Sequence, residues 1–158
     1  MSILDFYTWA EHSALGEWMR SYSSLFAMVE VVHVFGITLL LGTLFTVNFR
    51  LFGFALKSRP VSEIAEGLAP WTMGGYVLTF GTGIMLFSAE ALKMHDNSLW
   101  AYKVAALFAG LILQLTASRF ITKPGRAEAS PITAKLTAAF SVLIWLATGM
   151  MARIIAFI

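Results

Sequence analysis

Four long apolar stretches constrain this chain more than any other feature of its sequence. They run from about Ser24 to Phe49, from about Trp71 to Ala91, from about Leu99 to Ser118 and from about Ile132 to Phe157. A helix needs roughly 20 mostly apolar residues to cross the hydrocarbon core of a bilayer, and each stretch meets that length. The sequence therefore predicts an all-α integral membrane protein, a four-helix bundle in contact with the lipid bilayer.

Composition and length indicate a single transmembrane domain over residues 1–158. Apolar residues make up 58% of the chain and charged residues 13%, whereas soluble proteins are about half apolar and a quarter charged. Pro70 predicts a break before the second stretch, and Pro124-Gly125 and Ser130-Pro131 predict a turn before the fourth. The net charge of +2 gives no case for nucleic acid as a partner.

The residues before the first stretch predict a short amphipathic helix, about 3–19, that lies on the membrane surface. Its apolar positions recur at helical spacing, and Trp9 and Trp18 are suited to anchor it at the interface. This segment lacks a basic start and a uniform apolar run, so we do not expect a cleaved signal peptide. A second short amphipathic helix is expected after Pro60.

The basic residues predict which side of the membrane each loop faces. Seven of the eleven fall in the loops after the first and third spans: Arg50, Lys57, Arg59, Arg119, Lys123, Arg126 and Lys135. Basic loops stay in the cytoplasm. We therefore expect a multi-pass protein of the bacterial cytoplasmic (inner) membrane, with both termini outside.

His33 is the only histidine within a predicted span, and Glu30 lies one helical turn before it. At about 1.5 Å per residue, Glu30 is roughly 9 Å and His33 roughly 13 Å below the outer boundary. Ionisable groups at such depth are costly in lipid and mark functional sites. An internal hydrogen bond that merely holds the helices together is the alternative.

Other ionisable residues also fall in the outer half of the predicted bundle. Lys103 is about 6 Å deep, and Glu90 and Arg153 lie near the outer ends of the second and fourth spans. We expect them to form a polar network around His33, although Lys103 and Arg153 are also placed to extend their charges to the interface.

Haem b is the cofactor that best combines one intramembrane histidine with the absence of cysteine. In this hypothesis His33 binds the iron, Glu30 orients the imidazole, and Lys103 and Arg153 meet the propionates. Gly36 lies one turn after His33 and either leaves room for the macrocycle or serves close helix packing.

The second axial position of such a haem stays open at this point. Its candidates are His95 in the outer loop, Met85 on the second span and Met150 on the fourth. The same residues leave three other functions open: a metal site for an ion such as copper, a proton relay, and an accessory subunit with a structural polar core.

The pattern of the first span resembles a family of uncharacterised bacterial four-span membrane proteins. The residues that carry the resemblance are Glu30, His33 and Gly36 as Glu-x-x-His-x-x-Gly, the exit Arg50-Leu51-Phe52-Gly53, and Lys103. The likeness extends over nearly the whole chain and implies the same four-span fold.

More distantly, the chain is similar to the small four-span protoporphyrinogen oxidases and to the copper-resistance D membrane domain. Those families share a histidine in the first span and an aromatic residue followed by lysine at the third, here Trp100 and Lys103. The likeness implies a redox role associated with haem or copper. We therefore expect a haem b protein in electron transfer, with a redox partner, a larger membrane complex or a second copy of the chain; whether it is an enzyme stays open.

Overall fold

The computed structural model describes residues 2–123 and 131–157, and within them every regular element is a helix. Four helices are long and apolar enough to cross a membrane: Ser24–Phe52, Val61–Ala89, Ser98–Thr122 and Pro131–Ile155. The chain is thus a multi-pass membrane protein with the predicted number of spans. Arg126 and the predicted turn at Pro124-Gly125 and Ser130 lie outside the described residues.

The first span, α3 (Ser23–Phe52), ends at a glycine cap. Gly53 has φ +82°, a left-handed conformation that costs glycine little because it has no Cβ. The amide of Gly53 donates to the Arg50 carbonyl at 3.0 Å, and the amide of Phe54 donates to the Phe49 carbonyl at 2.9 Å. The last carbonyls of the helix are therefore satisfied before the chain turns back.

The second span, α4 (Val61–Ala89), is one continuous helix that contains Pro70. The prediction of a break at Pro70 is therefore wrong, as is that of a separate helix after Pro60. Proline removes only one backbone donor, and spanning helices tolerate that loss when neighbouring helices hold the segment. Close packing of α4 along α3 provides that support.

The N-terminal segment forms two helices, α1 (Ile3–Glu11) and α2 (Ala14–Ser21), where the sequence predicted one. Ser13 interrupts the pattern because its hydroxyl accepts a hydrogen bond from the amide of Gly16 at 3.2 Å and starts a new helix. Gly16 then lets α2 approach the carbonyl end of α4, where a Cβ would collide with the Ser88 carbonyl.

Arg20 fixes these N-terminal helices to the bundle. Its guanidinium donates to the carbonyls of Ala89 at 3.1 Å and Glu11 at 2.6 Å, at the ends of α4 and α1. The Glu11 carboxylate in turn accepts the amide of Leu92 at 2.6 Å, in the first turn of α5 (Ala91–His95). Helices α1 and α2, here called the surface arm, are therefore attached to the rest of the protein by hydrogen bonds as well as by apolar contact.

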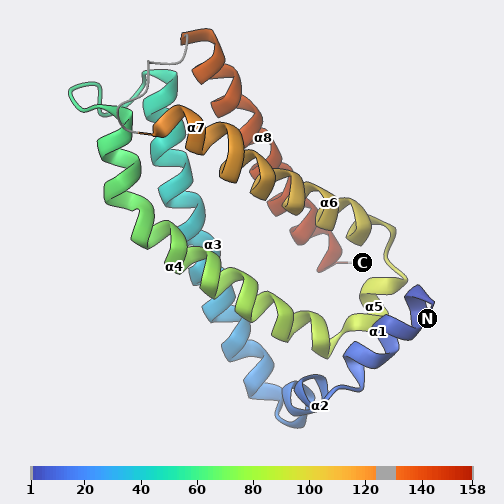
Figure 1. Cartoon of the computed structure of the whole chain (residues 1–158). Helices are drawn as coiled ribbons and strands as arrows, with labels where there is room; N and C mark the ends of the chain where they lie inside the picture. The colour runs from blue at the N-terminus through green and yellow to red at the C-terminus, as the bar shows by residue number, and fades with distance from the viewer. Residues whose placement is uncertain (1, 124–130, 158) are drawn as a thin grey trace.

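The third span starts with α6 (Ser98–Leu113), passes through a π-helical turn at Gln114–Ser118 and ends in α7 (Arg119–Thr122). The last span is α8 (Pro131–Ile155). Figure 1 shows α1, α2 and α5 gathered at the end of the bundle where both termini lie, opposite α7. We call this the terminal end of the bundle.

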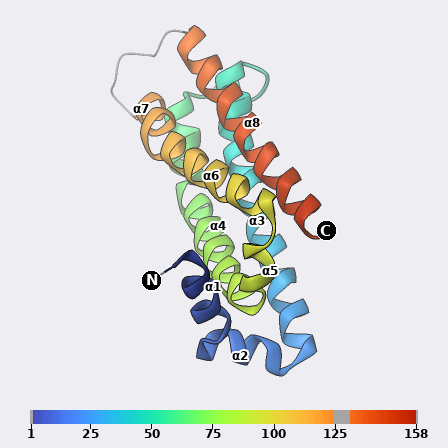
Figure 2. The same ribbon diagram turned by 90° about the vertical axis from the view of Figure 1, so that its right-hand side faces the viewer.

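The spans form two antiparallel pairs, α3 with α4 and α6 with α8. The pairs meet mainly through α3 and α8, where Leu40, Leu44 and Trp145 form a buried apolar cluster. In the same contact, buried Asn48 donates to buried Ser141 at 2.9 Å. The backbones of α4 and α6 hardly approach each other in the described chain, and Figure 2 shows the helices turned by 90° from Figure 1.

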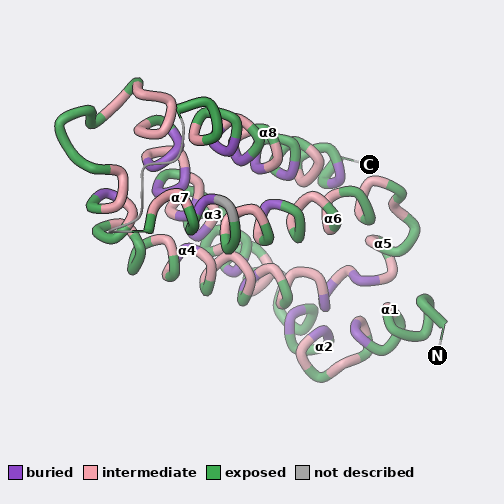
Figure 3. Tube along the Cα trace, turned by 45° about the horizontal axis from the view of Figure 1, so that its top comes forward, coloured by how far each residue is buried: buried purple, intermediate pink, exposed green. Residues whose placement is uncertain are grey.

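Burial follows this arrangement. Figure 3 shows buried residues along the inner side of α8, whereas α1 is mostly exposed. Many of the most exposed residues are large and apolar, including Val77 on α4, Ile112 on α6 and Leu143 on α8. Such a surface is suited to lipid rather than to water.

Candidate functional site

His33 lies between α3 and α4, half-buried, in the half of α3 nearer the terminal end. Its Nδ1 is 2.8 Å from the hydroxyl oxygen of Thr82 on α4. Gly83 provides the room for the imidazole ring, because a Cβ on Gly83 would lie 3.2 Å from His33 Cε1. A helix-to-helix polar contact is thus built from one residue of the first span and two adjacent residues of the second.

The hydroxyl of Thr82 determines which nitrogen of His33 carries the proton. That hydroxyl has a single hydrogen and donates it to the Leu78 carbonyl one turn earlier. With its hydrogen on that carbonyl, the hydroxyl accepts from His33, which assigns the proton of the neutral ring to Nδ1. Nε2 then keeps its lone pair. The Thr79 backbone also lies within hydrogen-bonding reach of the His33 ring.

The glycines near His33 bring α3 and α4 into close contact. A Cβ on Gly36 would lie 2.8 Å from Leu78 Cβ and 2.9 Å from the backbone nitrogen of Thr79. A Cβ on Gly75 would lie 2.8 Å from the backbone nitrogen of Leu40. Of the two readings that the sequence left for Gly36, the structure supports close packing, and no macrocycle fits between Gly36 and α4.

Lys103 and Glu30 both lie close enough to His33 for their charges to act on the imidazole. Half-buried Lys103 places its ammonium 5.0 Å from the centroid of the Trp100 ring, a cation–π contact within α6. Glu30 is exposed on the surface of α3. Thr82, rather than Glu30, contacts the imidazole Nδ1 and so has the orienting role that the sequence predicted for Glu30. Neither charge has a salt-bridge partner in the part of the chain that the structure describes.

The other members of the expected network lie elsewhere. Arg153 is exposed in the last turn of α8, with its guanidinium carbon 4.4 Å from the ring centroid of Phe157. Glu90 occupies the C-terminal cap of α4 and makes no ion pair among the described residues. The structure therefore keeps Lys103 and Glu30 near His33 and does not assemble the full polar network.

The three candidates for a second axial ligand have other surroundings. His95 Nδ1 is 3.0 Å from the carboxylate of its neighbour Asp96, and its ring packs edge-on against Tyr7. Met85 packs on the apolar cluster that contains Met19 at the α2–α4 contact. Met150 is 67% exposed on α8 and faces away from the bundle.

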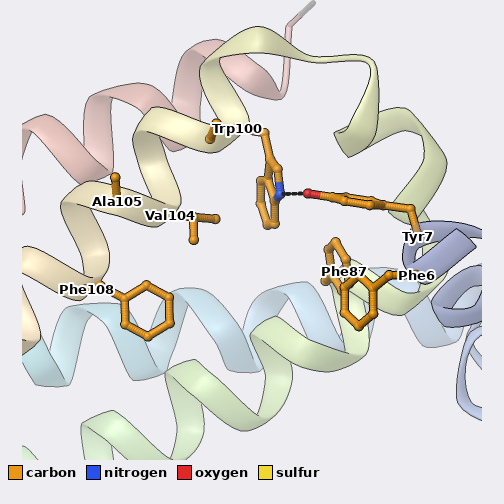
Figure 4. A pocket seen from close by; sticks show the side chains of 8 residues that line it. Phe6, Tyr7, Phe87, Trp100, Val104, Ala105 and Phe108 are labelled. Carbon is orange, nitrogen blue, oxygen red and sulfur yellow. Dashed lines mark hydrogen bonds between the residues drawn. The ribbon is translucent and has the colours of Figure 1, made fainter. Parts of the chain in front are cut away.

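An aromatic cluster joins α1 to the terminal ends of α4 and α6. Phe87 and Trp100 stack with centroids 5.4 Å apart and planes 6° apart, and the indole N–H of Trp100 donates to the Tyr7 hydroxyl at 3.0 Å. Beside it lies a pocket of about 580 Å³ (Figure 4), here called the aromatic pocket. It is lined by Phe6, Tyr7, Phe87, Trp100, Ala101, Val104, Ala105 and Phe108.

Sequence reasoning missed Thr82 and Tyr7. Threonine is common in membrane helices, and no local pattern distinguishes Thr82 from Thr79 one turn earlier. Tyr7 falls within the predicted surface helix with nothing in the sequence to mark a partner, and its contact with Trp100 joins residues 93 positions apart. Only the packing of the helices brings these partners together.

Comparison with known proteins places the chain in a family. No curated protein and no solved structure matches it. Residues 6–158 match the model of a family of unknown function. The matched range contains His33, Glu30, Gly36, Lys103 and the residues that line the aromatic pocket. A four-span chain of an uncharacterised family was the expectation from the first-span pattern. The protein belongs to the family of unknown function DUF6644.

Proposed function

We propose that this protein binds haem b in the membrane through His33 and has an electron-transfer or redox-accessory role. The observation that carries the proposal is the state of the imidazole. Its Nδ1 is 2.8 Å from the Thr82 hydroxyl, and with the proton assigned to Nδ1 the Nε2 lone pair is left for a ligand. Histidine ligands of metals usually have this arrangement, with the distal N–H fixed by an oxygen acceptor.

The donor set favours haem over a bare metal ion. Within the described residues no group of three or more His, Asp or Glu side chains is placed to hold a metal ion. Haem carries four nitrogen donors of its own, so a single histidine suffices as its protein ligand. Bound haem supplies one-electron redox chemistry.

The surroundings of His33 supply the other contacts that the proposal needs. Lys103 is a cation without a carboxylate partner in the described chain and meets the charge requirement of a propionate. The site must lie on the side of His33 away from Gly36, because α4 fills the space at that glycine.

The first-span histidine and the Trp100 and Lys103 pair, which we expect to be shared with four-span protoporphyrinogen oxidases and copper-resistance D domains, support a redox role. The distribution of basic residues supports a location in the bacterial inner membrane, with both termini outside. In that orientation His33 lies in the outer half of the membrane, where a redox partner, a larger complex or a second copy of the chain completes the electron path.

The test is the absorption spectrum of detergent-purified protein from haem-replete cells. We expect a Soret band that is lost in His33→Ala and kept in His12→Ala, since His12 lies in the surface arm between α1 and α2. A colourless wild-type preparation would overturn the proposal. A Soret band that survives in His33→Ala would remove His33 as the ligand.

The hydrogen bond between His33 and Thr82 itself supports a second candidate, an accessory subunit with a structural polar core. In that case no haem is bound, and His33→Gln keeps the contact and leaves folding nearly intact. Co-purification of a larger membrane complex with both proteins would support this candidate. Stoichiometric copper without a Soret band would instead support the metal-handling alternative.

A further inference from the structure

The aromatic pocket is polar at one end and apolar along the rest of its length (Figure 4). The polar end holds the Tyr7 hydroxyl and the Trp100 indole N–H, at the membrane-surface helix α1. From Trp100 the wall continues along α6 to Phe108, a rise of about 12 Å toward the middle of the span at 1.5 Å per residue. This polarity fits an amphiphile with a hydrogen-bonding head near the surface and a hydrocarbon tail in the membrane.

The Tyr7 hydroxyl is a donor that the protein leaves unused. It accepts the Trp100 N–H, and indole nitrogen only donates, so the phenolic hydrogen is free for a second bond. Within the described residues that hydrogen has no acceptor. The ammonium of Lys103, over the Trp100 ring at 5.0 Å, adds positive charge beside the same wall. The pocket therefore favours a head group that carries oxygen acceptors and partial negative charge.

The shape and chemistry of the lining favour a flat ring as that head group. Phe6, Phe87 and Trp100 line the polar end and stack on one another, which makes that part of the wall aromatic. Ala101 and Ala105 keep the α6 wall low where a larger side chain would fill it. A volume of about 580 Å³ lies within the usual range of roughly 300–1,000 Å³ for small-molecule sites.

We infer that the aromatic pocket binds a membrane quinone. One ring carbonyl accepts the Tyr7 O–H, the ring packs on the aromatic residues, and the isoprenoid tail follows α6 past Val104 and Phe108. The choice of a quinone over other ring-bearing amphiphiles rests on the proposed redox function, since quinones are the lipid-soluble carriers that exchange electrons in membranes. The binding itself requires no haem, because His33 does not line the pocket.

The experiment measures quenching of tryptophan fluorescence by decylubiquinone in purified protein. Ala105→Leu fills the pocket from an exposed position on α6, so the fold is retained. Ala109→Leu is the matched control, the same change one turn further on the same helix at an exposed site outside the pocket. We expect at least tenfold weaker binding in Ala105→Leu, unchanged binding in Ala109→Leu, and about fivefold weaker binding in Tyr7→Phe.

Two further arms separate a quinone from lipid and from the haem proposal. A short-chain phosphatidylglycerol should not displace decylubiquinone, and binding should persist in His33→Ala, which lacks the proposed haem ligand. Equal affinities in Ala105→Leu and Ala109→Leu would overturn the inference, as would full displacement by the phospholipid. Quinone binding without a Soret band would leave this inference standing and refute only the haem proposal.

Discussion

Replacing Thr82 by valine removes the acceptor of the His33 Nδ1–H and changes little else. Valine has nearly the shape of threonine, and the Leu78 carbonyl keeps its hydrogen bond within α4. The cost is therefore that of losing one hydrogen bond of the imidazole between two membrane helices, partly offset by the Thr79 backbone, which also lies within hydrogen-bonding reach of the ring. An unpaired buried donor costs about 1–3 kcal/mol, and interhelical hydrogen bonds in membranes average roughly 0.6 kcal/mol. We expect a loss of about 1 kcal/mol in the free energy of unfolding.

Equilibrium unfolding in mixed micelles of increasing SDS content, followed by circular dichroism, measures this loss. Thr79→Val is the matched control, because the Thr79 hydroxyl is buried one turn earlier on α4 and has no hydrogen-bond partner in the described structure. Its replacement should be neutral or slightly stabilising. Equal stabilities of the two variants would refute the hydrogen bond and, with it, the assignment of the proton to Nδ1.

Three further predictions test the packing of the bundle and its surface arm. Gly75→Ala should lower the free energy of unfolding by about 1–3 kcal/mol through overpacking, because the added Cβ would lie 2.8 Å from the α3 backbone. In the same unfolding titration Gly74→Ala should cost little, because its Cβ would meet only a leucine methyl at 3.9 Å. Asn48→Leu leaves Ser141 without its donor and should lower the Tm, and the added Ser141→Ala change should restore part of the loss if the two residues act as a pair. The backbone N–H of Ser2, the N-cap residue of α1, donates to the Asp5 carboxylate and holds the pKa of Asp5 below its ordinary value of 3.8. The carboxylate thus stabilises the start of α1 at neutral pH, and it loses this effect as the pH falls below 3.8 through its lowered pKa. In this pH range amide exchange in α1 should accelerate in the wild type but not in Asp5→Asn.

The number and approximate position of the spans were predictable because hydrophobic length is a local property. The prediction failed where a local signal was outweighed by packing. A proline usually ends a helix in water. Helix α4 continues through Pro70 because its neighbours there, α3 and lipid, offer its backbone no hydrogen-bond partners other than those of the helix itself. Ser13 acts in the opposite direction, since its cap divides the predicted surface helix into two.

The candidate site was predictable only in its central residue. His33 stands out in the sequence because an imidazole is costly in an apolar span. Its partner Thr82 does not stand out, and the sequence favoured Glu30 instead. Glu30 lies three residues before His33, and because a helix turns about 100° per residue, Glu30 is about 60° to one side. That offset is enough to leave Glu30 exposed while His33 faces Thr82 and Gly83 on α4.

The sequence by itself determined that this chain is a four-span membrane protein with one imidazole deep in its first span, because apolar length and the cost of burying a charge are set residue by residue. The tertiary structure decided which nitrogen of His33 is free, that Gly36 serves packing, and that α1 meets α6 around an aromatic pocket. These features depend on distances between helices far apart in the chain. They follow from how the helix surfaces fit together, which no local pattern encodes.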